Sequence, residues 1–298
     1  MKIQFLNGGL ANQAFQYIFA RYYALSHPGD VMYMDDSYFA LNTVHNGYEL
    51  EKVFGIRPHM LSECFDKTVW DFILYTRQQE HKSVPQILME NGIPVEMISE
   101  VGKDSQHFNP FNGKRHDIPC RQYFPEILDI STPENIYYHG YWINKNWFET
   151  YQEVFLKEFQ FPEITDERNL QYIKKITTLP SISIHIRRGD YIQLNMDFSA
   201  DFYQLCIDAF FVQYGRSWNL FVFSDDIPWC KEHAKEMHFD TFESVTFVEG
   251  NVQGENYRDL QLMSKCKAMI MSNSAFCFLA ALLNTEKEIV LNLTDREL

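Results

Sequence analysis

Short apolar runs alternate with helical periodicity through the second half of the chain. Apolar runs predict strands at residues 181–186, 219–223, 245–248, 268–271 and 288–291. Between them, apolar side chains recur three or four positions apart, which predicts helices at 201–214, 228–237, 257–266 and 274–283. Because parallel strands need a crossover connection, this alternation predicts a parallel, doubly wound sheet.

The first half opens with a strand, a glycine-rich break and a helix. Residues 2–6 form an apolar strand signal, and the break follows at residues 7–9. A second apolar run at 31–34 would extend the same sheet. The helix after the break has one apolar face, formed by Phe15, Ile18, Phe19 and Tyr22.

Apolar residues do not recur at an even spacing over residues 61–135. Six of the eleven prolines lie in this region, from Pro85 to Pro133. We expect helices and long loops in that region. Regular alternation begins after about residues 161–179. We therefore predict two α/β domains, over residues 1–165 and 166–298.

Composition narrows the class of protein. A chain of 298 residues with 46% hydrophobic side chains can bury one large core or two ordinary ones. Its formal net charge of −14 repels phosphate backbones, so nucleic acid is not an expected partner. There is no basic leader followed by an apolar run, and no run of about 18 apolar residues. We expect a cytoplasmic protein, with attachment to the cytoplasmic face of a membrane left open.

The six cysteines are scattered, without a C-x-x-C pair or a histidine at zinc-ligand spacing. We expect reduced thiols rather than a disulfide framework or a metal site. The six are Cys64, Cys120, Cys206, Cys230, Cys266 and Cys277.

The most specific segment reads IHIRRGDY, at residues 184–191. Alternation along the strand places His185 and Arg187 on one face, and Gly189 leads into a loop at the carboxyl end of the sheet. Ligands bind at that end in open α/β sheets, and adjacent arginines can grip a diphosphate bidentately. The alternative is an ordinary ion pair between Arg188 and Asp190, with His185 a satisfied core histidine.

This segment resembles the first motif of the bacterial α-1,2-fucosyltransferases, glycosyltransferase family eleven, and of the wider fucosyltransferase superfamily. The resemblance implies a GT-B-like fold, in which two Rossmann-like domains face a cleft and residues 166–298 bind GDP-fucose. It implies that Arg187 holds the β-phosphate of GDP, that His185 reaches the guanosine and that Arg188 supports the diphosphate.

The N-terminal segment GGLANQAFQY is similar to the opening signature of the same family. Glycines allow close backbone approach, and the helix start that follows offers unpaired N–H groups to an anion. The resemblance implies that Asn12 and Gln13 line the cleft. As chemistry alone the signal is weak, because Asn12 could simply cap the helix.

Two later segments match the family in order. FSDD at 223–226 ends a strand as the second motif does, although a helix cap before Pro228 is at least as good an explanation. Residues 259–274 resemble the third motif. That resemblance assigns Asp259 to guanine recognition and places three residues near the diphosphate: Ser272, Asn273 and Ser274.

Other features depart from the family or resemble it less closely. Family members commonly carry Ser-x-Phe-Ser-Trp-Trp after the third-motif turn, whereas this chain has AFCFL at 275–279, which keeps an apolar helix face. The segment GYWINKNWF resembles a weaker signature, in which Tyr141, Trp142 and Trp147 are either core or sugar-stacking residues, with core favoured.

The resemblance implies an inverting transfer of L-fucose from GDP-β-L-fucose to a galactose-containing oligosaccharide, at O2, with no metal or other cofactor. Arg187 and Arg188 would neutralise the departing GDP. Asp190 is the candidate general base, unless it forms the ion pair with Arg188, and Asp197 is a second candidate. The alternatives are a fucosyltransferase of different linkage and a GDP-sugar-binding protein without turnover.

Overall fold

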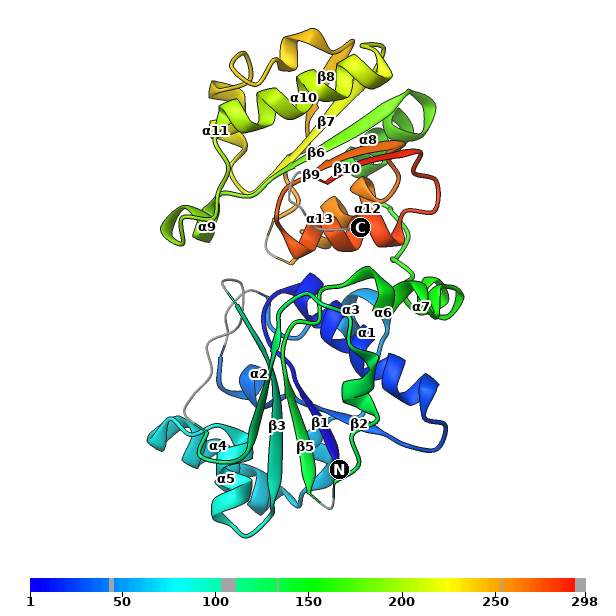
Figure 1. The fold of residues 1–298 in the computed structure, drawn as a ribbon. Helices are drawn as coiled ribbons and strands as arrows, with labels where there is room; N and C mark the ends of the chain where they lie inside the picture. The colour runs from blue at the N-terminus through cyan, green and yellow to red at the C-terminus, as the bar shows by residue number, and fades with distance from the viewer. Residues whose placement is uncertain (43–45, 103–110, 133, 253, 293–298) are drawn as a thin grey trace. The chain divides into compact units, whose positions relative to one another are not determined.

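A computed structural model describes residues 1–42, 46–102, 111–132, 134–252 and 254–292. The chain forms two compact units, Met1–Gln160 and Phe161–Leu298, against an expected boundary after residue 165. Each unit is an α/β layer structure around its own parallel sheet (Figure 1). The prediction of two α/β domains, the second with a parallel sheet, is confirmed, and the sheet of the first unit is parallel as well.

The sheet of the first unit has the order β2-β1-β5-β3-β4 in the described residues, and all its neighbouring strands are parallel. Its strands are β1 (Lys2–Phe5), β2 (Met32–Asp35), β3 (Val95–Val101), β4 (Arg115–Pro119) and β5 (Asn135–His139). Its helices are α1 (Leu10–Ser26), α2 (Ser37–Leu41), α3 (Leu50–Phe54), α4 (Lys67–Glu80), α5 (Val84–Glu90), α6 (Lys145–Glu149) and α7 (Gln152–Glu158), with 3-10 turns at Leu61–Cys64 and Pro125–Leu128.

Helices cover both faces of this sheet. Ile3, Met97 and Tyr137 point to the face that packs against α4 and α5. The neighbouring Tyr138 points to the other face, where its ring meets Phe19 of α1. Alternating residues of one strand therefore enter two different cores, as expected for a parallel sheet that is buried on both sides.

The expectation of only helices and loops over residues 61–135 is wrong, because β3 and β4 lie there. Strand β3 is buried almost throughout but contains Glu96, Ser99 and Glu100. Polar residues in a central strand interrupt the apolar run by which a buried parallel strand is recognised. Strand β4 is a polar edge strand with alternating exposure, RHDIP.

The buried carboxylate of Glu100 ties two loops to the end of β3. It accepts hydrogen bonds from the backbone N–H groups of Arg121, Tyr141 and Trp142, over 2.9, 2.7 and 2.8 Å. Burial raises the pKa of Glu100, and the three N–H donors oppose that rise. A buried carboxylate is tolerated here because its lone pairs are used.

The tryptophans of the GYWINKNWF segment belong to the core, as favoured from the sequence. Trp142 and Trp147 are both fully buried. Trp142 stacks on Phe19 with ring centroids 4.2 Å apart, and its indole N–H donates to Gln4 Oε1 over 2.7 Å. Neither indole presents a face to a sugar.

The sheet of the second unit has the order β10-β9-β6-β7-β8 in the described residues, again parallel throughout. Its strands are β6 (Ser181–Ile186), β7 (Asn219–Ser224), β8 (Ser244–Phe247), β9 (Ala268–Met271) and β10 (Ile289–Asn292). Its helices are α8 (Glu167–Thr178), α9 (Gly189–Gln193), α10 (Ala200–Tyr214), α11 (Ile227–Glu232), α12 (Tyr257–Met263) and α13 (Ala275–Leu283), with a 3-10 turn at Phe239–Thr241.

This second sheet is doubly wound. One face, with Ile182 and Ile184 of β6, packs against α10 through Tyr203 and Phe210. Helices α8, α12 and α13 lie against the other face (Figure 1). The regular half of the sequence folds as its periodicity predicts, although the predicted helix 228–237 ends earlier, at Glu232.

No disulfide joins any of the six cysteines, all of which lie in the described ranges. Among those ranges, no helix combines the length and the apolar character that a membrane crossing requires.

Candidate functional site

The carboxyl end of β6 brings the first and third motifs together. His185 is buried near the end of the strand, and its Nδ1 lies 2.8 Å from Ser272 Oγ, in the turn after the neighbouring strand β9. Burial, with the charge of Arg187, lowers the pKa of His185 to about 3, so the ring is neutral. The histidine is thus a satisfied buried residue that fixes the spacing of two motif turns.

Arg187 follows the strand and is held by two carboxylates. Its Nη2 lies 2.7 Å from Asp190 Oδ1, and its Nη1 lies 2.9 Å from Asp225 Oδ2. Asp225 also accepts the backbone N–H of Arg188 over 2.9 Å. Asp225, which follows β7, therefore fixes both the side chain of Arg187 and the backbone that leaves β6.

Arg188 points to a different set of partners. Its guanidinium reaches Asp226 Oδ2 over 3.2 Å and Asp197 Oδ2 over 3.3 Å. Its Cζ also lies over the ring of Trp229, 3.9 Å from the centroid. Carboxylates and an aromatic face fix this arginine in a way that a lysine could not reproduce.

The ion pair expected between Arg188 and Asp190 does not form, because Asp190 pairs with Arg187 instead. Helix α9 begins at Gly189, so Asp190 lies in its first turn, three residues after Arg187 and beside it. Arg188 turns the other way, toward α11.

The FSDD segment combines the two roles that the sequence left open. Asp226 is the N-cap of α11, where its Oδ1 accepts the N–H of Trp229 over 3.1 Å, so the cap interpretation is confirmed. Both aspartates also bind the arginines of the first motif. Sequence analysis missed that pairing, although β6 and β7 could have been expected to be neighbours and their carboxyl ends to meet at one edge. No group of three or more His, Cys, Asp or Glu side chains in the described ranges is arranged to hold a metal ion.

Asp259 lies in the first turn of α12, where Asn251 Nδ2 donates to its Oδ1 over 2.7 Å. Burial raises the pKa of Asp259 to about 7, while the Asn251 hydrogen bond and the charge of Arg168 act in the opposite direction. The carboxyl group therefore titrates near neutrality in the free protein.

The turn after β9 is organised by its own side chains. Asn273 Nδ2 donates to the carbonyl of Met196 over 2.7 Å, which ties this turn to the segment after α9. Ser274 is the N-cap of α13, and its Oγ accepts the N–H of Phe276 over 3.2 Å. Residues 277–279, which differ from the common family pattern, are buried, so the expected apolar helix face is present.

In the first unit, Gln13 holds the glycine loop between β1 and α1. Its Nε2 donates to the carbonyls of Gly8 and Gly47, each over 2.9 Å. Its Oε1 accepts the N–H of Glu49 over 2.8 Å. The side chain is fully buried, so its amide organises the backbone at the carboxyl end of β1.

Asn12 has no such anchoring. It is half-buried, and its amide makes no hydrogen bond to another group in the described residues. The N-cap of α1 is Gly9, so the suggestion that Asn12 caps the helix is wrong. Gly8 has φ +78°, and a Cβ there would lie 2.7 Å from Asn12 Nδ2. Glycine is therefore needed for this loop to lie against Asn12.

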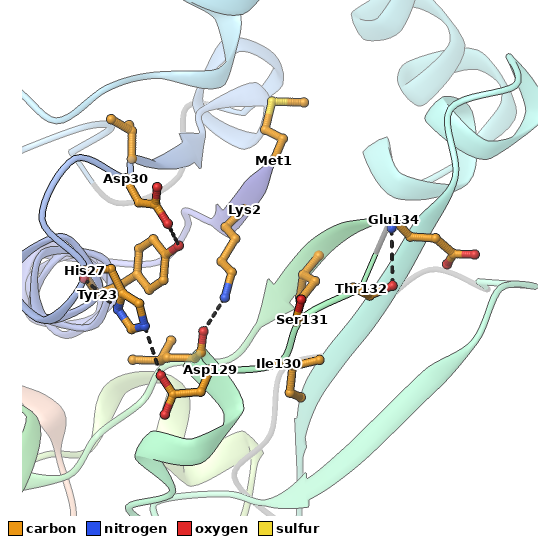
Figure 2. Close-up of a pocket in the computed structure, with 13 residues that line it drawn as sticks. Met1, Lys2, Tyr23, His27, Asp30, Asp129, Ile130, Ser131, Thr132 and Glu134 are labelled. Atoms are coloured by element: carbon orange, nitrogen blue, oxygen red, sulfur yellow. Dashed lines mark hydrogen bonds and ion pairs between the residues drawn. The ribbon is translucent and has the colours of Figure 1, made fainter.

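A separate surface pocket of about 520 Å³ lies at the opposite, amino end of β1 (Figure 2). Its polar groups satisfy one another. Tyr23 donates to Asp30 over 2.8 Å, and His27 Nε2 lies 2.9 Å from Asp129 Oδ1. The Tyr23 ring is covered by His27 and by the Lys2 ammonium, 4.4 and 4.6 Å from its centroid. We assign no role to this pocket.

The model of the family described as glycosyl transferase family 11 matches residues 90–297, more than two thirds of the chain. The chain belongs to glycosyl transferase family 11. The match includes all the arginine and aspartate positions of the second unit described above. This family-11 chain is accordingly a glycosyltransferase, which sets aside the alternative of a binding protein without turnover.

Curated relatives agree with the family. The chain is 29% identical to an alpha-1,2-colitosyltransferase of Escherichia coli, over 93% of this chain and 85% of the relative. It is 25% identical to the O-antigen biosynthesis glycosyltransferase WbnK of the same species, over 96% and 92%. A galactoside alpha-(1,2)-fucosyltransferase 2 of Gorilla gorilla gorilla is 24% identical over about half of each chain, 50% and 46%.

Solved structures with a similar chain course include fucosyltransferase NodZ from Bradyrhizobium, at 12% identity and a TM-score of 0.49 over 95% of this chain and 93% of NodZ. Another is POFUT1 in complex with GDP, at 13% identity and a TM-score of 0.47 over 97% of each chain. Likenesses at this level do not bear on the activity. What the chain itself shows is two α/β units, each with its own parallel sheet.

The contrast between Gln13 and Asn12 predicts opposite outcomes for two adjacent alanine variants. Gln13→Ala removes three buried hydrogen bonds and should lower the free energy of unfolding by about 2–3 kcal/mol. Asn12→Ala removes none and should stay within about 0.5 kcal/mol of wild type. Urea unfolding of both variants measures the difference, and equal losses would refute the assignment of Gln13 as the anchor of the loop.

Proposed function

We propose that this family-11 enzyme transfers L-fucose from GDP-β-L-fucose to O2 of a galactoside, with inversion to an α-1,2 linkage. The observation that carries the proposal is the arrangement at the end of β6, where His185 bonds the Ser272 turn and the two residues after the strand, Arg187 and Arg188, are held in place by aspartates. The α-1,2 linkage is taken from the names of two relatives, the alpha-1,2-colitosyltransferase and the galactoside alpha-(1,2)-fucosyltransferase 2.

The leaving group determines what the site must do. Negative charge grows on GDP as the bond to the sugar breaks, and fixed positive groups stabilise such charge when they are already in place. Arg187 is our proposed ligand of the β-phosphate, with Arg188 supporting the diphosphate. We propose that the arginines perform the task that a divalent cation performs in metal-dependent transferases.

The remaining assignments divide between the two units. Asp259 is proposed to recognise guanine, with His185 beside the guanosine and the residues of the β9–α13 turn, Ser272, Asn273 and Ser274, near the phosphates. Asn12, in the first unit, is proposed as a substrate-binding residue. Its side-chain amide, half-buried and not engaged elsewhere, supports this role.

Asp190 stays our candidate for the general base. In the free protein its Oδ1 is bound to Arg187, and its Oδ2 is the atom we propose to take the proton from the acceptor. Its side chain is 52% exposed, the highest value among the four aspartates that hold the two arginines. An exposed ion pair is worth only about 0–1 kcal/mol, so a diphosphate can displace it at small cost.

A second donor is favoured by a specific observation. The relative with 29% identity is named for transfer of colitose, a fucose that lacks the 3-hydroxyl group. The diphosphate and guanine contacts proposed above do not depend on that hydroxyl. Specificity between the two sugars must therefore come from groups around C3 of the sugar.

Product analysis tests the donor and the linkage together. GDP-fucose and GDP-colitose are each incubated with lactose in excess EDTA, and the product is examined by NMR for its linkage and anomeric form. We expect an α-1,2-fucosylated product at an undiminished rate in EDTA. If only colitose is transferred, the proposed donor is wrong. If the product has another linkage, the proposed acceptor position is wrong. Restoration of activity by Mg²⁺ or Mn²⁺ would reject the metal-free mechanism.

Substitution of Arg187 tests the phosphate assignment. Arg187→Ala should cost at least about 3 kcal/mol of transition-state stabilisation, because the leaving diphosphate loses a fixed positive partner. Arg187→Lys should fail almost as badly, since an ammonium cannot provide the guanidinium fork. Steady-state kinetics measure both losses, with exposed Arg216→Ala, which precedes β7, as the matched control. Near-normal turnover in either Arg187 variant would remove the assignment.

A further inference from the structure

A chain of polar side chains runs from α8 to Asp259 through Asn251, which is 7% exposed. Asn251 and Asn169 exchange a reciprocal pair of amide hydrogen bonds, 2.8 and 3.0 Å long. The second N–H of Asn251 donates to Asp259 Oδ1 over 2.7 Å. The second lone pair of Asn251 Oδ1 accepts from Arg168 Nη2 over 3.2 Å.

These four bonds use the full capacity of the Asn251 side chain, two donors and two acceptor sites. They also fix which way the amide faces. Because Arg168 can only donate, the oxygen of Asn251 must point to it, and the nitrogen must point to Asp259. The Arg168 charge polarises the amide and strengthens its hydrogen bond to the carboxylate.

The surrounding backbone holds this amide in place. Asp166, the N-cap of α8, accepts both the backbone N–H and the side-chain N–H of Asn169, over 2.9 and 3.0 Å. Gly250 has φ +92°, and a Cβ there would lie 2.1 Å from Arg168 Nη1. The positive φ favours glycine at this position, and a side chain there would displace the guanidinium of Arg168 from its place beside Asn251.

We propose that Asn251 is a positioning residue for base recognition, which holds the carboxylate of Asp259 so that it accepts the N1–H and 2-amino group of guanine. This inference rests on the proposed GDP-linked donor and deepens it. Asn251 occupies one lone-pair site on Oδ1 and leaves the other three sites of the carboxylate for the base. Asn251 itself does not touch the nucleotide.

Inosine diphosphate separates this role from a structural one, because it has the same phosphates and ribose as GDP but lacks the 2-amino group. Binding of GDP and of inosine diphosphate is measured by calorimetry for the full-length protein. Wild type should prefer GDP by at least about tenfold, the value of one charge-assisted hydrogen bond. Asp259→Asn should abolish that preference.

Asn251→Ala should reduce the preference to within about twofold, because GDP loses the bonds of both N1–H and the 2-amino group whereas inosine diphosphate loses only that of N1–H. Asn169→Ala, which leaves the contact with Asp259 in place but frees Asn251 to rotate, should give an intermediate preference. Asn284→Ala is the matched control: Asn284 is also buried in the same unit, and it bonds the carbonyl of Cys266 rather than Asp259. It should lower the melting temperature without changing the preference.

Each outcome decides between the claims. If Asn251→Ala folds and weakens both nucleotides equally, or leaves the preference intact while Asp259→Asn abolishes it, the positioning role is overturned. If Asn251→Ala does not fold, an unchanged preference in Asn169→Ala overturns it. If Asp259→Asn keeps the wild-type preference, the base assignment and this inference both fail. If wild type binds neither nucleotide, the proposed GDP-linked donor fails.

Discussion

Two consecutive arginines at the end of a buried strand need partners, and this need organises the second unit. Four described aspartates hold Arg187 and Arg188, two for each arginine. The aspartates come from three places: α9, the segment that follows it, and the start of α11. Without them, two positive charges on adjacent residues would repel one another. With them, the local charge is negative, so a diphosphate bound as we propose would compete with a carboxylate for Arg187.

The same logic explains the division of labour among the four aspartates. Asp225 also accepts a backbone N–H, and Asp226 also caps a helix, so removing either would leave backbone donors unpaired. Asp190 has an exposed side chain, which in the described part of the chain binds only Arg187. The aspartate that is easiest to displace is therefore the one beside the proposed phosphate ligand. Its release would open one side of the Arg187 guanidinium to the phosphate, while Asp225 still holds the other side.

The sequence was sufficient for the second unit, because its buried strands are continuous apolar runs separated by amphipathic helices. It was insufficient for β3, in which buried Glu96 and Glu100 interrupt the apolar run. Their partners are Lys114 for Glu96 and backbone N–H groups for Glu100, and local patterns do not reveal pairings so far along the chain. Fold prediction thus failed where burial of a charge depends on tertiary contacts.

Site prediction shows a similar limit. The motifs identified the residues at the strand ends, but they gave no account of which side chains pair. Asp190 was assigned to the wrong arginine, and the Asn251 link to Asp259 was not foreseen, since Asn251 belongs to no recognised motif. Side-chain partners depend on the direction in which each residue leaves its strand or helix, and periodicity does not determine this.

In the proposed mechanism, the essential step is that Arg187 gives up its contact with Asp190 and binds the β-phosphate. A crystal structure of the GDP complex measures it directly. The account predicts that the Arg187 guanidinium lies within hydrogen-bond distance of the β-phosphate, still bound to Asp225, with Asp190 released from its 2.7 Å contact. It would be contradicted by a bound diphosphate held elsewhere while Arg187 remains paired with both aspartates.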